Sequence, residues 1–133
     1  MAQEQFIKTF PKGLDLKLSE NFHLREFECK CTHEDCTETL VSMAHVARLE
    51  HLRRRLDKPI KINSAYRCKA HNKAVGGTPN RPHRLGTATD LALKFVDAIL
   101  FTSIFPGVII YDTFVHTDSR TGTPLLLYKL GDK

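Results

Sequence analysis

Two short segments of the chain combine histidine and aspartate with small residues at fixed spacings. The first, residues 83–90, reads His-Arg-Leu-Gly-Thr-Ala-Thr-Asp, which is an H-x-x-G-x-A-x-D pattern. The second, residues 114–118, reads Phe-Val-His-Thr-Asp and adds a second histidine and a second carboxylate. Two histidines and an aspartate can bind a zinc ion and leave one coordination position open for water. The sequence therefore predicts an open metal site.

The length and composition fit one globular domain. With 133 residues, of which 41% are hydrophobic, the chain is long enough to bury a core. We expect a single domain over residues 1–133, with an N-terminal arm at 1–18 and the core at 19–128. No apolar run approaches the roughly 20 residues that span a bilayer. We therefore expect a monomer that does not insert into membranes.

The first residues, Met-Ala-Gln-Glu-Gln-Phe, include an acid and no apolar run. A secretory signal needs such a run, so we expect no signal peptide. The protein is expected to be made in the cytoplasm. A substrate outside the cytoplasm would require another route of delivery.

The chain is basic, with a formal net charge of +5. This charge favours attraction to polyanions such as nucleic acid or an anionic cell-wall polymer. The densest basic stretch, residues 48–58, contains three consecutive arginines, which point to different sides of a helix. No aromatic residues for base stacking lie between them. We therefore expect no nucleic-acid partner.

The periodicity of apolar residues predicts an α+β fold, with N-terminal helices packed on a mainly antiparallel sheet that follows later in the chain. From Thr39 to Leu56 apolar residues recur at spacings of three and four, which is typical of an amphipathic helix that ends at Asp57-Lys58-Pro59. Residues 78–84 contain two prolines and are predicted as loop. The other predicted elements are a short helical turn opened by Ser19, helices at 70–75 and 96–105, and strands at 60–64, 89–93, 108–111, 114–118 and 125–128.

The candidate ligands fall on or beside predicted strands. His116 and Asp118 are two apart, so both side chains project from the same face of their strand. His83 is expected in a loop that leads into the strand of Asp90. Gly86 would let this backbone bend close to the metal, and Ala88 would leave room beside it. The alternative is that each histidine is a surface or satisfied core residue.

A longer series of motifs follows one order along the chain and resembles the M15 metallopeptidases. This group includes D-alanyl-D-alanine carboxypeptidases and murein endopeptidases, and it shares a fold with the N-terminal domain of hedgehog proteins. The resemblance covers roughly residues 16–120. Its motifs are Ser64-Ala65-Tyr66-Arg67, His71-Asn72, Val75-Gly76-Gly77, Asn80, the H-x-x-G-x-A-x-D segment and Phe114-Val115-His116-x-Asp118. The resemblance implies that His83, Asp90 and His116 bind zinc, with water or substrate in the fourth position.

The resemblance leaves the general base open. Thr113 stands where some members carry an acid, and Asp112 shares the parity of His116 but lies four residues away. We predict Asp118 as the base because it shares the face of His116; its alternative role is to orient an imidazole. Arg67 resembles the family arginine that engages the substrate or the developing oxyanion, with a surface salt bridge as the alternative.

The four cysteines, Cys29, Cys31, Cys36 and Cys68, have three possible states. The C-x-C-x4-C spacing lacks the paired C-x2-C motifs of ordinary zinc ribbons, so it is a weak metal signal. Free or packed thiols are the default in the cytoplasm. One or two disulfides, or a second, structural zinc ion with His33 as an extra candidate ligand, are the alternatives. Because Cys68 follows Arg67, it would bring the N-terminal loop against the active-site strand.

The leading hypothesis is a zinc metallopeptidase, either a carboxypeptidase or an endopeptidase, that degrades peptidoglycan in the bacterial cell wall. A small basic chain without a signal fits a phage endolysin, which would reach the wall during lysis. A bacterial murein hydrolase fits the same residues. The alternatives are a non-catalytic, metal-stabilised module that binds the cell wall or a protein, and a zinc-containing nucleic-acid binder suggested by the charge.

Overall fold

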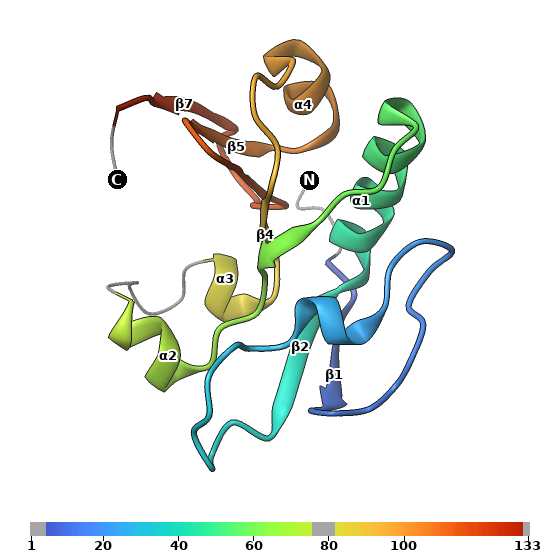
Figure 1. Cartoon of the computed structure of the whole chain (residues 1–133), viewed down its shortest axis with the longest axis vertical. Coiled ribbons are helices and arrows are strands. Elements are labelled where there is room, and N and C mark those ends of the chain that lie inside the picture. Colours follow the sequence, from blue (N-terminus) through green and yellow to red (C-terminus); the bar gives the residue numbers. More distant parts are fainter. Residues whose placement is uncertain (1–4, 76–81, 132–133) are drawn as a thin grey trace.

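A computed structural model describes residues 5–75 and 82–131 and shows an α+β fold, which confirms the predicted class (Figure 1). The strands are β1 (Ile7–Pro11), β2 (Glu38–Ser42), β3 (Ile62–Ser64), β4 (Ala88–Leu91), β5 (Gly107–Tyr111), β6 (Val115–Asp118) and β7 (Leu125–Lys129). The helices are η1 (Leu24–Phe27, a 3-10 turn), α1 (Met43–Leu56), α2 (Lys69–Ala74), α3 (Pro82–Leu85) and α4 (Ala98–Ile104).

The main sheet has five strands in the order β3-β4-β6-β5-β7. Every neighbouring pair is antiparallel except β5 and β7, which are parallel. The prediction of a mainly antiparallel sheet late in the chain is therefore confirmed. A separate two-stranded sheet pairs β1 with β2, so the predicted N-terminal arm contains a strand.

The long helix begins later than its apolar periodicity predicts. Residues Thr39 to Val41 belong to β2, because the chain at this point pairs with β1. Helix α1 starts at Met43, and the Ser42 hydroxyl caps it by accepting a hydrogen bond from the backbone N–H of His45 at 3.1 Å. The helix ends as predicted, with Asp57 in the left-handed conformation at φ 52°.

Two other local predictions are wrong. The first helical turn after the arm starts at Leu24 rather than near Ser19, and the Glu26 carboxylate accepts a hydrogen bond from the backbone N–H of His23. The segment predicted as loop up to Arg84 contains α3, in which Pro82 takes the first helical position, where proline is tolerated. The predicted helix stop at Gly76-Gly77 lies outside the described residues.

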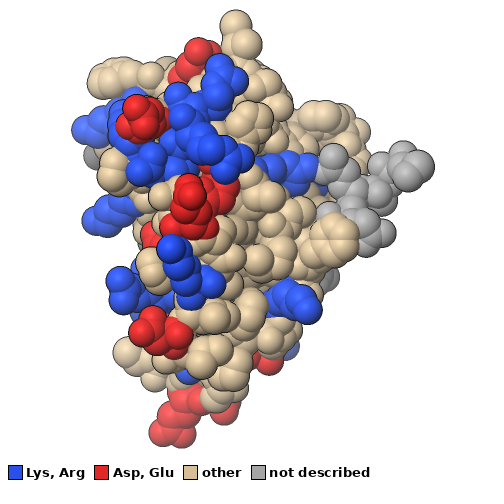
Figure 2. Space-filling model, turned by 90° about the vertical axis from the view of Figure 1, so that its right-hand side faces the viewer, with Lys and Arg blue, Asp and Glu red and all other residues tan. Residues whose placement is uncertain are grey.

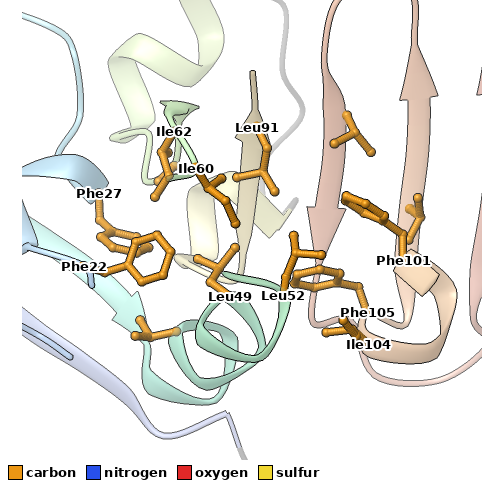
Figure 3. Packing of buried hydrophobic residues seen from close by; sticks show 14 of the residues in the cluster. Phe22, Phe27, Leu49, Leu52, Ile60, Ile62, Leu91, Phe101, Ile104 and Phe105 are labelled. Carbon is orange, nitrogen blue, oxygen red and sulfur yellow. The ribbon is translucent and has the colours of Figure 1, made fainter. Parts of the chain in front are cut away.

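The core lies between α1 and the elements on either side of it. Figure 3 shows Leu49 and Leu52 of α1 between Phe22 on one side and Phe105 on the other. Both leucines are fully buried, and burial of each such side chain contributes about 1.5–3 kcal/mol. Leu91 of β4 also belongs to this cluster, so the sheet presents one of its faces to the core.

The other face of the sheet carries the histidine and the two aspartates of β4 and β6. Leu91 and Val115 are cross-strand partners in the core, and Asp90 is the partner of His116 one position along. Successive side chains of a strand point to opposite faces. Asp90, His116 and Asp118 therefore lie on the face opposite the apolar core.

Charged residues of both signs share the face of the molecule that Figure 2 shows. Lys and Arg side chains gather over part of this face, with Asp and Glu interspersed among them.

Among the described residues, no helix is long and apolar enough to cross a membrane.

Candidate metal centre

The sheet and one short helix bring the three predicted ligands together. Asp90 of β4 lies directly opposite His116 of β6 in the antiparallel register, and α3 places His83 beside them. One donor atom from each residue lies within 4.8 Å of the others. Sequence segments that are far apart along the chain thus form one cluster, as predicted.

The spacing of the donor atoms suits a single metal ion. His83 Nε2 lies 3.2 Å from Asp90 Oδ1, and His116 Nδ1 lies 3.0 Å from the same oxygen. Zinc bonds of about 2.0–2.1 Å in tetrahedral geometry place neighbouring donor atoms roughly 3.3 Å apart. Two imidazoles and one carboxylate also form a donor set that zinc prefers, so these residues fit a zinc ion.

Each histidine is oriented through its other ring nitrogen. His83 Nδ1 donates to the carbonyl oxygen of Ala65 at 2.7 Å, which leaves Nε2 to face Asp90. His116 Nε2 donates to Asp118 Oδ2 at 2.8 Å, which leaves Nδ1 to face the same carboxylate. Hydrogen bonds of this kind fix the tautomer and the ring orientation of metal-binding histidines.

Asp118, the residue predicted as general base, is fully buried beneath His116. Besides His116 it accepts hydrogen bonds from Arg120 Nε at 2.8 Å and Arg120 Nη2 at 2.7 Å. The contacts of Asp118 thus match its alternative role, the orientation of the imidazole. Its assignment as the base stays a prediction.

Small residues on the neighbouring strands make room for this carboxylate. Ala88 and Gly107 lie opposite Asp118 on either side of β6. A Cβ atom at Gly107 would lie only 2.0 Å from Asp118 Oδ1. Gly107 therefore makes room for Asp118, and the expected role of Ala88 in leaving room beside the metal stays a prediction.

Gly86 also has a different role from the one predicted. Its φ is +79°, and a Cβ atom there would lie 2.4 Å from the carbonyl oxygen of Leu40. Its own carbonyl accepts a hydrogen bond from the backbone N–H of Ser42. Gly86 thus lets the backbone approach β2, and the expected bend toward the metal stays a prediction.

Arg67 contacts the third ligand. Its Nη2 donates to Asp90 Oδ2 at 3.4 Å, while Oδ1 of the same carboxylate faces the histidines. Its Nε donates to the hydroxyl of Ser64, the residue opposite Asp90 on β3. The guanidinium therefore orients Asp90 and also lines the cleft above the site.

The two aspartates are anionic for the same physical reason. Burial alone would raise the pKa of Asp90, but hydrogen bonds from His116 and His83 outweigh it and lower the pKa below its ordinary value. Burial likewise would raise the pKa of Asp118, and the hydrogen bonds from Arg120 and His116 lower it. For His116, burial would lower the pKa, but its bonds to the two aspartates raise it. Each carboxylate of the site thus has a cationic guanidinium beside it, Arg67 at Asp90 and Arg120 at Asp118.

The cluster lies in a cleft of about 780 Å³. Arg67 and Arg120 both line this cleft, as does the carboxylate-bearing Asp112. The rings of Tyr111 and Phe114 stack in its wall, with centroids 4.3 Å apart. The cleft can therefore accept a ligand that has both anionic and apolar parts.

Three contributors to the site were missed from the sequence. Arg120 follows Asp118 by two residues, a spacing that puts both on one face, so this pattern could have indicated the pair. Gly107 is separated from Asp118 by a hairpin, and the carbonyl of Ala65 is a backbone acceptor with no side-chain signature. Neither of these two had a signal in the sequence.

The cysteines form a second cluster. The sulfur atoms of Cys29, Cys31, Cys36 and Cys68 all lie within 4.8 Å of one another, and all four are free thiols. The backbone N–H of Cys68 donates to Cys29 Sγ at 3.4 Å. The expectation that Cys68 brings the N-terminal loop against the Arg67 segment is confirmed.

Comparison with known proteins identifies one family. The model of a family described as peptidase M15 matches residues 20–118. This span includes all three predicted ligands and both residues predicted to act in catalysis. No curated protein sequence matches the chain.

Proposed function

Because the chain belongs to the peptidase M15 family, we propose that it is a zinc-dependent peptidase that hydrolyses a peptide bond in bacterial peptidoglycan. The observation that carries this proposal is the cluster of three donor atoms, from His83, Asp90 and His116, in the cleft. A catalytic zinc ion has three protein ligands and one open position, whereas a structural zinc ion has four protein ligands. The three-residue set therefore suits catalysis.

These three residues would bind the zinc ion. When bound, zinc supplies a Lewis acid that polarises the scissile carbonyl and lowers the pKa of a coordinated water toward about 7. Asp118 accepts the Nε2–H of His116. With zinc bound, Nδ1 would give up the proton that it shares with Asp90, and its lone pair would face the ion. Arg67 holds the second oxygen of Asp90, so that the first oxygen faces the histidines.

The general base must be a group that water in the cleft can reach. Asp118 is fully buried and accepts hydrogen bonds from His116 and Arg120. Asp112 is exposed and lines the cleft. These positions favour Asp112 as the proton acceptor and Asp118 as the residue that orients His116. Asp112→Asn would then lower kcat while zinc binding is retained.

The substrate proposal depends on the charge of the cleft. Peptidoglycan stem peptides carry carboxylates next to small apolar residues. Guanidinium groups bind carboxylates through paired, charge-assisted hydrogen bonds, and Arg67 and Arg120 line the cleft. The stacked Tyr111 and Phe114 offer an apolar surface beside them.

The test is digestion of purified peptidoglycan with mass spectrometry of the soluble products. We expect the wild type to release peptide fragments, a chelator to stop the release, and zinc to restore it. His83→Ala should abolish the activity. His51→Ala, which removes an exposed imidazole from α1, is the matched control and should be fully active. Full activity of His83→Ala would contradict the mechanism.

The masses of the products also separate the finer proposals. Release of a terminal amino acid would indicate a carboxypeptidase, and release of cross-linked or whole stem peptides would indicate an endopeptidase. An endolysin would in addition lyse cells when it is produced together with a membrane-permeabilising protein. A murein hydrolase would act without that lysis.

Asp118 is occupied by hydrogen bonds from His116 and Arg120, which disfavours its use as a base. This favours one other candidate, a non-catalytic module of the same fold that binds the wall. A full complement of zinc, binding to sacculi and no released fragments from several wall types would support this candidate over the peptidase.

A further inference from the structure

We propose that Cys29, Cys31, Cys36 and Cys68 bind a second zinc ion in a closed site with four thiolate ligands. Three of these residues belong to the irregular segment 28–37, and the fourth precedes α2. Their four sulfur atoms lie within 4.8 Å of one another. The argument for this site does not depend on the proposed peptidase function.

The sulfur positions suit a tetrahedron. Zinc–sulfur bonds of about 2.3 Å place neighbouring sulfur atoms roughly 3.8 Å apart. Cys31 Sγ and Cys68 Sγ are 3.5 Å apart, well beyond the roughly 2.05 Å of a disulfide bond. Two disulfides would need two pairs of bonded sulfur atoms, whereas here all four sulfur atoms are free and lie within 4.8 Å of one another. His33, the extra candidate from the sequence, is not part of this group.

Hydrogen-bond donors point at the sulfur atoms. The backbone N–H groups of Cys68 and His71 each donate at 3.4 Å, to Cys29 Sγ and Cys68 Sγ respectively. Lys12 Nζ lies 3.4 Å from Cys36 Sγ. Four thiolates around a divalent ion leave a net negative charge, which the lysine partly offsets. Such donors form the outer shell of metal–thiolate sites.

The cysteine cluster lies in a part of the fold that has little regular secondary structure to stabilise it. Cys29 and Cys36 are buried and pack with Tyr66 in a small cluster separate from the main core. Residues 28–37 form no helix or strand. A metal ion would therefore link this segment to the chain around Cys68.

The link has a direct structural consequence. Cys68 follows Arg67 and caps α2, because its sulfur accepts from the backbone N–H of His71. A zinc ion on Cys68 would fix the backbone next to Arg67. Loss of this ion should loosen the Arg67 segment and leave the main sheet intact.

The experiment measures zinc in the full chain, purified under reducing conditions, by elemental analysis. We expect about two zinc ions per wild-type chain and one in the His83→Ala/His116→Ala variant. X-ray absorption of that variant should show only sulfur ligands at about 2.3 Å. Cys31→Ser should retain one ion, with nitrogen and oxygen ligands. Lys12→Met, which keeps all four sulfurs, should retain two ions but release one several-fold faster to a chelator.

Three results would overturn the proposal. One is a double-histidine variant that contains no zinc. Another is nitrogen or oxygen in the ligand shell of its zinc. The third is disulfide-linked cysteines in unreduced, metal-free denatured protein. The absorption measurement uses chains with all four cysteines, so it stays decisive even if Cys31→Ser does not fold.

Discussion

At Asp118, one carboxylate connects the imidazole of His116 to the guanidinium of Arg120. Asp118→Asn keeps the shape of the side chain but removes the charge that both partners need. We expect a loss of about 10–100-fold in zinc affinity, measured by competition with a chromogenic chelator. Asp15→Asn, at an exposed position, is the control. Unchanged affinity in Asp118→Asn would exclude the orienting role.

Gly107 is the residue that makes room for this carboxylate. Gly107→Ala would place a methyl group 2.0 Å from Asp118 Oδ1, so that the carboxylate or the strand must shift. We expect a destabilisation of about 1–3 kcal/mol in denaturant unfolding, together with weaker zinc binding. Gly122→Ala adds a methyl group to open space at a φ of +86°, so it strains the backbone without a contact to Asp118 and should bind zinc normally. Normal zinc binding by Gly107→Ala would contradict this prediction, because it would show that Asp118 can move without weakening the metal site.

His45 is buried under the sheet, where its ring contacts Ser119 Oγ at 2.7 Å and Thr89 Oγ1 at 2.9 Å. Burial lowers the pKa of His45 to about 3. The unfolded chain binds a proton at this residue below about pH 6.5, whereas the folded chain does not until about pH 3. The stability contribution is therefore complete above about pH 6.5 and is lost on acidification.

We expect His45 to lower the free energy of unfolding by roughly 2 kcal/mol as the pH falls from about 6.5 to 5. Urea unfolding in the His83→Ala background measures the loss without interference from catalytic zinc. His45→Gln cannot take up a proton and should show a flatter pH dependence. Equal slopes for the two proteins would contradict the assignment.

At the scale of elements, α1 is connected to the segment before η1 through Glu50. Its carboxylate accepts hydrogen bonds from Ser19 Oγ at 2.5 Å and from Asn21 N at 2.6 Å. Burial would raise the pKa of Glu50, but these bonds outweigh it and lower the pKa. Glu50→Ala should cost about 1–3 kcal/mol in thermal unfolding, because two partly buried donors lose their acceptor. Glu34→Ala, at an exposed position, should cost little.

The elements show which parts of the fold a sequence reveals. The end of α1 at Asp57, helix α2 and the late strands were predicted, because local periodicity and turn residues determine them. The start of α1 was not, because Thr39 to Val41 pair with β1, a contact that is distant in sequence. The sequence does not predict helix α3, because the two prolines in residues 78–84 favour a loop.

Part of the candidate site could likewise be predicted from the sequence, and part could not. His83, Asp90 and His116 could be chosen from their spacing and their resemblance to a family, and the register of β4 and β6 brings two of them together. The choice between general base and orienting residue for Asp118 depends on how deeply its carboxylate is buried. Strand alternation shows on which face a side chain lies but not how deeply it is buried. The closeness of Cys68 to the N-terminal cysteines was expected only from its place after Arg67 in the family motif, because no local pattern reveals a contact across more than thirty residues.

For the whole molecule, the proposals imply that metal contributes to stability at two separate places. A ligand that binds only the folded state stabilises it by about 2.7 kcal/mol at a concentration of 100 Kd. Chelation should therefore lower the melting temperature of the wild type in calorimetry. The double-histidine variant should keep part of this shift, and Cys31→Ser should keep the complementary part. A shift that vanishes entirely in either variant would contradict two independent contributions.

The three proposed zinc ligands do not belong to equally stable parts of the fold. Strand β6, which carries His116, is bonded on both sides by β4 and β5, whereas His83 comes from the four residues of α3. Short helices open at a lower free-energy cost than central strands. Metal exchange should therefore proceed by local unfolding at α3, with amide hydrogens in β6 still protected.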